Sequence, residues 1–514
     1  MKNILFLIFI ISFFSSCNKA KEHSSLSDNS MVINNSDFGI FENQTNIGNP
    51  KNNGHINYNA KTQEYTISGS GINMWANSDQ FQYLYKSIQG DFILRAHVKF
   101  IGDGNDPHRK IGWIVRNNLS TNSAHVNASV HGDGLTSLQY RKVAGNETEE
   151  VLSKNKAPDV IQLERRNNIY YMSTAKFGEP LITVKIEDVN LRNEVFVGVY
   201  VCSHNPEVTE KAVFSNVRII KPAAPNFKPY EDYIGSNMEI MNIETGLRKT
   251  LFYSSHSLQA PNWVNNDKEL VYNSNGYLYR YNFETKEVQQ INSGFAINNN
   301  NDHVFSFDES ILGISHHNPD DNGNSSLYIM NPKGDSLPKK ITKDGIGASY
   351  LHGISPDNKT LIYTANRNNK YDIFGIDIET REEFQLTDTP DLDDGSEYSQ
   401  DGKFIYFNSN RTGTMQLWRM KPDGSKPQQL TFDENYKDWF PHISPDGQWI
   451  AFISFPADIA FGDHPFYKQC TLRLMPANGG IPKIIAYIYG GQGTINVPSW
   501  SKDSKHIAFV TNSD

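Results

Sequence analysis

Four side chains that could hold a metal ion recur at one place in a repeated phrase. His303, His352, Glu397 and His442 each stand two or three residues before a serine that opens a short turn. Imidazole nitrogens and carboxylate oxygens, completed by water, are common ligands of divalent cations. If the fold gathers these positions, they predict a site for Mn, Ca or Zn. The alternative is that each histidine is a hydrogen-bonded packing residue. The two spacings also differ, and strand neighbours alternate in direction, so one pair could point between sheets.

Further polar and aromatic residues lie in segments expected beside these four. The candidate ligand-binding residues are Asn262, Asp302, Arg367, Arg411, Tyr467 and Gln492. His464, in the long insert 455–469, is the candidate general base, because an imidazole can take up a proton near neutral pH. Polar groups and aromatic rings that converge on a concave surface are the usual features of a small-molecule site.

The phrase itself occurs six times in the second half of the chain. Its copies begin at Pro261, Asp302, Leu351, Gly395, Phe440 and Val497. They are roughly 40 to 60 residues apart, and four-stranded propeller blades repeat about every 40–50 residues. The Ser-Pro-Asp-Gly form favours a turn, because Pro presets φ, Asp caps its own backbone and Gly accepts a positive φ. Aromatic or β-branched runs such as 404–407 follow the copies. The pattern predicts propeller blades.

The blade count depends on the two ends of this region. The last copy supplies only two strands, whereas residues 238–254 have the pattern of an outer strand pair. We therefore expect a six-bladed propeller over 237–514, closed by 238–254 and 498–512 in one blade. Closure of this kind leaves no long unpaired edge. In such a ring the residues before each serine surround one mouth of the central channel.

The repeat resembles the PD40 repeats of TolB-like six-bladed propellers, and the resemblance covers residues 230–514. It implies the fold, and it implies a binding or scaffold protein with partners in the cell envelope, although fold alone does not fix function. The propeller lyases that cleave oligogalacturonate share this repeat type. That second resemblance implies that His303, His352 and His442 bind the metal, with Gln492 or Glu397 completing the set.

In that enzyme interpretation the metal would acidify a proton beside a sugar carboxylate or ketone, and His464 would remove it. Those lyases have seven blades, whereas six are counted here, and their motifs do not match residue by residue. The leading hypothesis is therefore an exported propeller that binds a saccharide, another small polar ligand or an envelope protein. The alternative is a metal-dependent lyase or hydrolase of carbohydrates.

Residues 37–222 alternate apolar and polar positions with frequent turn signals, which predicts an antiparallel β-sandwich and makes the chain all-β. The run GDF-x-L-x-A-x-V-x-F followed by G-x-IVR resembles the concanavalin-like modules attached to glycan-active bacterial proteins. Arg116 and His125 belong to a polar cluster expected on the solvated face, with a carbohydrate-contact surface as the alternative. A Pro-rich linker follows at 223–236.

Residues 1–17 read as a lipoprotein signal peptide, with a charged start, an apolar run and a Ser-Ser-Cys ending. That ending resembles a bacterial lipobox, which implies lipidation of Cys17 and attachment to the outer membrane, facing the periplasm or the exterior. The alternative is an ordinary signal in which the cysteine is coincidental. Residues 18–36 should form a flexible tether. Cys202 and Cys470 are expected to be buried thiols, or else a bridge between domains.

The composition narrows the possible partners. The chain has 514 residues and a formal charge of −9 with no basic block. These features argue against nucleic acid and against an anionic membrane surface as partners, so membrane contact is expected only through the lipid anchor.

Overall fold

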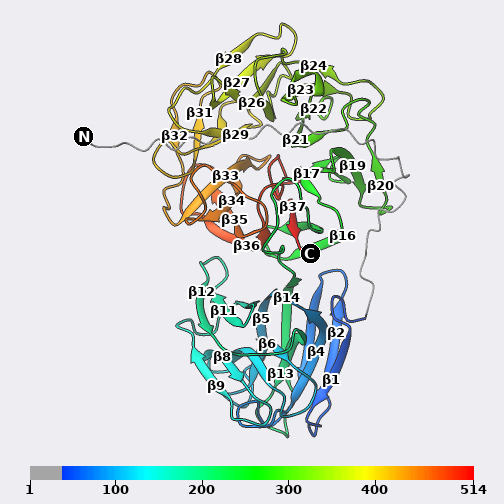
Figure 1. The fold of residues 1–514 in the computed structure, drawn as a ribbon, viewed down its shortest axis with the longest axis vertical. Helices are drawn as coiled ribbons and strands as arrows, with labels where there is room; N and C mark the ends of the chain where they lie inside the picture. The colour runs from blue at the N-terminus through cyan, green and yellow to red at the C-terminus, as the bar shows by residue number, and fades with distance from the viewer. Residues whose placement is uncertain (1–36) are drawn as a thin grey trace, which may run out of the picture.

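The computed structural model describes residues 37–514, which form two all-β units stacked along the long axis of the molecule (Figure 1). The predicted signal peptide 1–17, with Cys17, and the tether 18–36 lie outside the described residues. Within 37–514 no helix is long and apolar enough to span a bilayer. The one helical element of that range is a 3-10 turn, η1 (Pro319–Asp321). The prediction of an all-β fold is confirmed.

The N-terminal unit consists of two seven-stranded antiparallel sheets. The first has the order β1-β4-β13-β6-β7-β8-β9 and the second β12-β11-β10-β5-β14-β3-β2. The first sheet comprises β1 (Asn43–Ile47), β4 (Phe81–Gln89), β6 (Lys110–Arg116), β7 (His125–His131), β8 (Thr136–Arg141), β9 (Glu149–Leu152) and β13 (Glu194–Cys202). The second comprises β2 (His55–Asn59), β3 (Glu64–Gly69), β5 (Phe92–Ile101), β10 (Val160–Arg166), β11 (Ile169–Ala175), β12 (Ile182–Ile186) and β14 (Glu210–Ile220).

The two sheets enclose a single apolar core. Trp113 and Val199 from the first sheet pack with Leu94 and Phe214 from the second. Alternate residues of each strand point into this layer, as the period-2 pattern requires of stacked sheets. The prediction of a β-sandwich is confirmed. Cys202 and Cys470 are both free and buried, as the thiol interpretation expected.

The prediction of a solvated face at Arg116 and His125 is wrong, because both side chains are fully buried. Arg116 Nη1 and Arg141 Nη2 donate to the Asp79 carboxylate at 2.5 and 2.7 Å. The neighbouring loops fold over this face, and the carbonyl of Ser120 accepts a further guanidinium N–H. A sequence pattern does not show that a loop covers a sheet.

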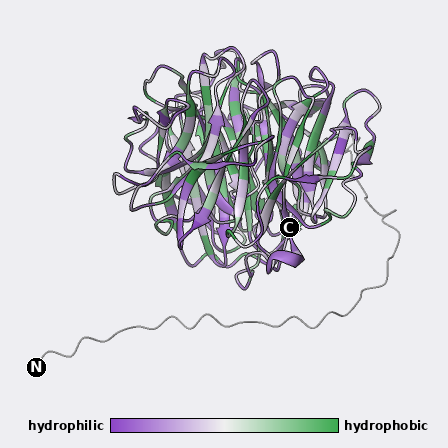
Figure 2. Cartoon of the chain, turned by 90° about the horizontal axis from the view of Figure 1, so that it is seen from above, coloured by the Kyte–Doolittle hydropathy of each residue, from purple (hydrophilic) through white to green (hydrophobic). Residues whose placement is uncertain are grey.

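The second unit is a six-bladed propeller, as predicted. Five four-stranded sheets follow one another in sequence order, from β17–β20 to β33–β36. The sixth blade joins the two ends of the unit in the order β16-β15-β37, with a bridge between Trp500 and Ile507 as its inner edge. The pairing of β15 with β37 closes the ring. Seen along the long axis, hydrophobic strand segments lie inside and hydrophilic loops surround them (Figure 2).

The blades have the following bounds. The closing blade contains β15 (Ser236–Asn242), β16 (Arg248–Ser254) and β37 (His506–Asn512). The next two contain β17 (Gln259–Val264), β18 (Glu269–Ser274), β19 (Tyr277–Asn282) and β20 (Val288–Gln290), then β21 (Asn299–Phe305), β22 (Leu312–His317), β23 (Ser325–Met330) and β24 (Lys339–Lys340). The last three contain β25 (Ser349–Ile354), β26 (Thr360–Arg367), β27 (Lys370–Asp377), β28 (Glu383–Gln385), β29 (Asp393–Tyr398), β30 (Ile405–Ser409), β31 (Gln416–Met420), β32 (Gln428–Gln429), β33 (Tyr436–Ile443), β34 (Trp449–Pro456), β35 (Lys468–Pro476) and β36 (Lys483–Gly490).

The repeated serine organises the turn after each inner strand. In the third blade Ser355 Oγ donates to Asp357 Oδ1 at 2.6 Å and accepts the N–H of Thr360 at 2.9 Å. The same two bonds recur at Ser306, Ser399, Ser444 and Ser501. The side chain thus satisfies backbone and carboxylate groups at the turn, which is the physical basis of the repeat.

Each inner strand of the five complete blades contains a β-bulge. The register shifts fall at 259/262, 299/303, 351/353, 394/397 and 439/442. An extra residue at a bulge breaks strict alternation and redirects the side chains beside it. Counting back from the serine therefore does not predict which side chains enter the channel.

Candidate functional site

A cavity of about 900 Å³ opens at one mouth of the propeller. Its walls come from the bulged ends of β21, β25, β29 and β33, from the linker between β14 and β15, and from the insert 455–469. The linker and the insert are held together by aromatic contacts, since Phe227 packs on Tyr467 at 4.8 Å between ring centroids. The blade of β17 and β18 also contributes Gln259 and Asn273, so the mouth is built from all five complete blades and two long connections.

Four of the predicted site residues line this cavity: Asp302, His352, His464 and Gln492. They come from β21, β25, the insert and the segment after β36, so the ring closure brings together residues far apart in sequence. Gln492 Oε1 accepts the side-chain amide of Asn496 at 2.9 Å, and Asn496 Oδ1 accepts the N–H of Gly493. The loop that carries Gln492 is thereby held in place.

Arg367 and Arg411, two predicted binding residues, do not line the cavity. Arg367 makes two bonds to the Glu383 carboxylate, at 3.1 and 2.6 Å, and Arg411 donates to Asp393 at 2.8 Å. Both partners lie in the same blade as the arginine or at its edge. These arginines are therefore tied within their blades.

Asn262 and Tyr467 also lie outside the cavity lining. Asn262 Nδ2 donates to the carbonyl of Pro498 at 2.7 Å, and Ser499 Oγ donates to the carbonyl of Pro261. This exchange ties the first complete blade to the closing blade. The Tyr467 hydroxyl accepts the N–H of Ile234, so that side chain fixes the linker.

The predicted metal ring is not formed by His303, His352, Glu397 and His442. His442 Nε2 donates to the carbonyl of Ile495 at 2.6 Å and its Nδ1 lies 2.6 Å from Glu397, so both ring nitrogens are engaged within the protein. His303 is fully buried, and burial lowers its pKa to about 4. Among residues 37–514 no group of three or more His, Cys, Asp or Glu side chains is arranged to hold a metal ion. Of the four, Glu397 and His442 contact each other, whereas His352 lies against Asp394.

The most polar part of the cavity is a line of three groups, Asp302, His352 and Asp394. His352 Nε2 lies 3.1 Å from Asp394 Oδ1, and Asp394 also accepts the Thr364 hydroxyl at 2.5 Å. Burial would lower the pKa of His352, but the hydrogen bond and charge of Asp394 raise it above its usual value. Burial would raise the pKa of Asp394, and the bond to His352 lowers it to about 2. Both shifts favour the charged forms of this pair.

Asp302 lacks such a partner. It is buried, and it belongs to no ion pair in the part of the chain that the structure describes. Burial raises the pKa of Asp302 to about 7, with a smaller contribution from the Asp394 charge, although His352 works in the opposite direction. A buried carboxyl that is half protonated near neutral pH can both donate and accept hydrogen bonds. It is the feature of this mouth that a packing role does not explain.

Aromatic side chains form the rim and floor of the cavity. Seven line it: Tyr230, Tyr233, Tyr350, Tyr371, Phe440, Phe461 and Phe466. Phe440 adopts a positive φ of 54°, which is uncommon for a bulky residue, and its ring contacts both His352 and His464. Tyr230 and Phe461 are 66% and 60% exposed, so their rings are accessible at the entrance.

Asparagine amides supply most of the remaining polar surface. Nine line the cavity: Asn273, Asn275, Asn298, Asn299, Asn300, Asn301, Asn369, Asn410 and Asn496. Asn273 Nδ2 donates to the carbonyls of Asn299 and Asn300, which fixes the start of β21. The buried Nδ2 of Asn301 has no partner within the described residues. Amides present donors and acceptors together, as ligands rich in hydroxyl groups require.

Sequence reasoning missed Asp394, Tyr350 and Phe440. The signal for Asp394 is the Asp-Asp-Gly run at 393–395, where Gly395 has a φ of 64° and an added Cβ would meet Asn408 Oδ1 at 2.5 Å. A glycine required by a bulge, directly after an acidic residue, marks a carboxylate that the bulge redirects.

Comparison with known proteins gives relatives and solved structures that match between 27% and 55% of this chain. A family described as the TolB beta propeller domain (PD40) matches residues 347–463. An uncharacterized protein of Agrobacterium fabrum is 39% identical over 276 residues, which is 54% of this chain and 92% of that protein. The Tol-Pal system protein TolB of Wolinella succinogenes is 28% identical over 148 residues, 27% of this chain and 34% of its own. A solved Agrobacterium tumefaciens structure with a provisional TolB name is 37% identical, with a TM-score of 0.52, and covers 55% of this chain and 100% of its own.

Proposed function

Because this chain belongs to the TolB-like β-propeller family, we propose that it is an exported protein whose propeller mouth binds a saccharide. The observation that supports this function is the buried carboxyl of Asp302, which faces a cavity of about 900 Å³ without an ion-pair partner. A buried carboxyl without a cation partner is unfavourable in its charged form unless a ligand or water completes its bonds.

The chemistry of the lining favours a polyhydroxylated ligand. Aromatic faces can pack against the apolar faces of sugar rings, and amides and carboxylates can bond the hydroxyl groups. The lining carboxylates Asp302, Asp391 and Asp394 outnumber its one lysine, Lys370, which is already paired with Asp372 and Asp388. A strongly anionic sugar would be repelled here, so the ligand should be neutral or weakly basic.

The location of the protein is part of the same proposal. The signal-like start and the Ser-Ser-Cys ending at Cys17 support export and a lipid anchor in the outer membrane. The partial identity to a protein named as part of the Tol-Pal system supports an envelope setting. Metabolic labelling with radioactive palmitate tests the anchor. We expect labelled protein in the wild type and none in the Cys17→Ser variant, and equal labelling of the two would overturn it.

The ligand is tested by calorimetry with a panel of neutral and amino-substituted oligosaccharides. We expect at least one to bind the wild type in the micromolar to millimolar range, and Asp302→Asn and Tyr371→Ala to weaken it about tenfold or more. Lys333→Gln, at an exposed turn away from the cavity, is the matched control and should bind like the wild type. A wild type that binds no member of the panel would overturn the saccharide proposal.

A second candidate is an envelope protein docked at the same mouth, which the identity to the Wolinella TolB favours. A pull-down from envelope extracts distinguishes the two. A partner that the wild type captures, and that Phe461→Ala and Tyr230→Ala lose, would support protein docking. Displacement of that partner by an oligosaccharide would instead place both functions in one cavity.

A further inference from the structure

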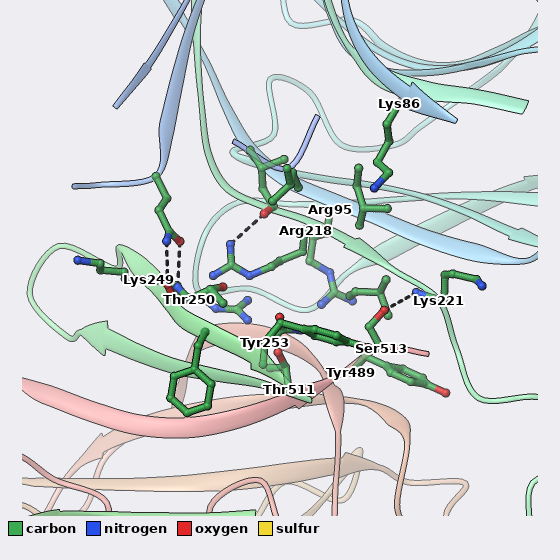
Figure 3. A pocket seen from close by; sticks show the side chains of 18 of the residues that line it. Lys86, Arg95, Arg218, Lys221, Lys249, Thr250, Tyr253, Tyr489, Thr511 and Ser513 are labelled. Carbon is green, nitrogen blue, oxygen red and sulfur yellow. Dashed lines mark hydrogen bonds between the residues drawn. The ribbon is translucent and has the colours of Figure 1, made fainter. Parts of the chain in front are cut away.

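A second large cavity lies between the sandwich and the propeller, away from the propeller mouth. Its volume is about 970 Å³. The sandwich contributes parts of β4, β5 and β14, and the propeller contributes β16 and the ends of β36 and β37. Figure 3 shows Lys86 extending from the sandwich towards this space, with Tyr253 and Tyr489 on the propeller side.

Two buried arginines of the cavity wall share one carboxylate. Arg218 Nη2 donates to Glu239 Oε2 at 2.6 Å, and Arg248 Nη2 donates to Glu239 Oε1 at 2.9 Å. Burial would raise the pKa of Glu239, but Arg218 and Arg248 lower it to about 2, so it carries one negative charge against two positive charges. The same carboxylate accepts the Thr511 hydroxyl.

A third buried guanidinium, Arg95, has no carboxylate partner within the described residues. Its Nε and Nη2 donate to the side-chain oxygen of Gln162, and its Nη1 donates to the carbonyl of Tyr487 at 2.5 Å. It is 3% exposed. Burial and the charge of Arg248 lower the pKa of Arg95 to about 9, so it stays charged at neutral pH. The buried carboxylates of Glu164 and Glu239 act on Arg95 only from beyond hydrogen-bonding distance, so the three buried arginines outnumber the buried carboxylates around them.

Lysines add to this charge at the rim. Lys86, Lys221, Lys249 and Lys286 line the cavity, whereas its lining carboxylates are Glu194 and Asp514. Lys249 forms no ion pair among residues 37–514, and burial and Lys286 lower its pKa. Lys86 is paired only at 3.6 Å with the half-exposed Glu42. In a chain of net charge −9, positive groups are concentrated here.

We propose that this cleft between the domains binds a multiply charged organic anion, carrying carboxylate, sulfate or phosphate groups. The lysines at the entrance supply donors and point charges to such oxyanions. The buried guanidinium groups of Arg95, Arg218 and Arg248 make their hydrogen bonds within the protein and add positive charge behind the lysines. The tyrosines Tyr58, Tyr253 and Tyr489 offer flat apolar surface beside the charges. The ligand bridges the two domains, since Lys86 lies on β4 of the sandwich and Lys249 on β16 of the propeller.

Calorimetry at low ionic strength with trigalacturonate, a sulfated trisaccharide, inositol hexakisphosphate and inorganic phosphate tests this site and separates the sources of anion. We expect at least one organic probe to bind the wild-type full chain, and to bind at least tenfold more weakly to the Lys86→Gln/Lys249→Gln double variant. Both lysines are partly exposed, so this variant should fold. Affinity should fall as salt is added, because the contacts are ionic.

Two further variants serve as controls. Lys333→Gln removes one exposed lysine elsewhere and should leave the affinity unchanged, as should Asp302→Asn at the propeller mouth. Arg95→Gln removes a buried positive charge behind the lysines and should also weaken binding; if it fails to fold, the double variant decides the outcome. A wild type that binds none of the organic probes, or a double variant that binds them as tightly as the wild type, would overturn the proposal.

Discussion

Two buried aspartates, Asp79 in the sandwich and Asp302 in the propeller, differ in whether cations compensate the burial of their carboxyl groups. Asp79 is fully enclosed and accepts bonds from both Arg116 and Arg141. Burial would raise its pKa, but the charges of His125, Arg116 and Arg141 lower it below its usual value. Asp302 is buried as deeply but has no cation in bonding range, and burial raises its pKa to about 7.

The difference lies in whether the charged groups around each carboxylate all have bonding partners. At Asp79 even the spare guanidinium hydrogens are bonded, since Arg141 Nε donates to the carbonyl of Asn146 and Arg116 Nη2 to that of Ser120. Asp302 has no cation partner among the described residues, and it lines an open cavity. Residue type alone therefore does not separate a structural polar cluster from a binding site, whereas unmet bonding capacity beside a cavity does.

Asp79→Asn should have the largest effect. Removing the carboxylate leaves Arg116 and Arg141 buried with uncompensated charges, which should lower the free energy of unfolding by about 3–5 kcal/mol. Urea unfolding followed by fluorescence measures this, with Lys333→Gln as the control that keeps the wild-type midpoint. An unchanged midpoint in Asp79→Asn would show that the cluster contributes nothing to stability. The contrast between Asp79 and Asp302 would then be wrong.

Asp302→Asn should raise the free energy of unfolding at high pH, whereas Asp79→Asn lowers it. The folded pKa of about 7 lies above the ordinary 3.8, so the folded state holds more protons than the unfolded state between about pH 4 and pH 7. Wild-type stability should therefore fall as pH rises through this window, by as much as about 4 kcal/mol. The amide variant should lack this fall and be more stable than the wild type at pH 8. Parallel pH profiles of the two proteins would contradict the assignment.

Asp394→Asn tests the interaction between Asp394 and His352 within the cavity. His352 owes its raised pKa to the hydrogen bond and charge of Asp394. Loss of that charge should lower the pKa of His352 by about 1–3 units. An NMR titration of the imidazole C–H signals measures the shift, and His256, an exposed histidine outside the cavity, is the internal reference. A His352 titration that does not move would mean that the pair is not ionic.

Ser355→Ala probes a third aspartate, Asp357, which faces water. The change removes the hydroxyl that donates to Asp357 and that accepts the N–H of Thr360. Because Asp357 is exposed and can bond water in place of the hydroxyl, we expect a loss of only about 1 kcal/mol in unfolding free energy. Thermal unfolding measures it, and a loss as large as that of Asp79→Asn would remove burial as the explanation of the series.

The fold was open to prediction because its signals are local and repeated. The Ser-x-Asp turns mark the end of each inner strand, and their spacing gives the blades. The odd strand pair at 238–254 and the short last copy led to the closure that β15 and β37 make. Each of these inferences needs only turn chemistry and a count along the chain.

The site was only partly predictable, because it depends on contacts that the sequence does not display. His352 was found from its place before the serine, and Asp302 from the polar segment expected beside it. His303 and His442 have the same kind of place, but the bulges of β21 and β33 direct them elsewhere. Arg367 was assigned to a ligand because its partner Glu383, 16 residues away, is not visible as a partner in sequence. Asp394 was missed because the bulge of β29, which redirects its carboxylate, is not visible in the sequence.

The joining of β15 to β37 has a consequence for how the chain is made. A ribosome delivers β15 and β16 long before β37, so this hairpin must wait with one edge unpaired while the five intervening sheets are translated. The sandwich, made earlier, can already be folded during that delay. A chain whose translation stops before residue 506 would lack β37 and leave the propeller open, with one edge of β15 unpaired. Such an edge can pair with other chains, so we expect the truncated protein to aggregate or to be degraded.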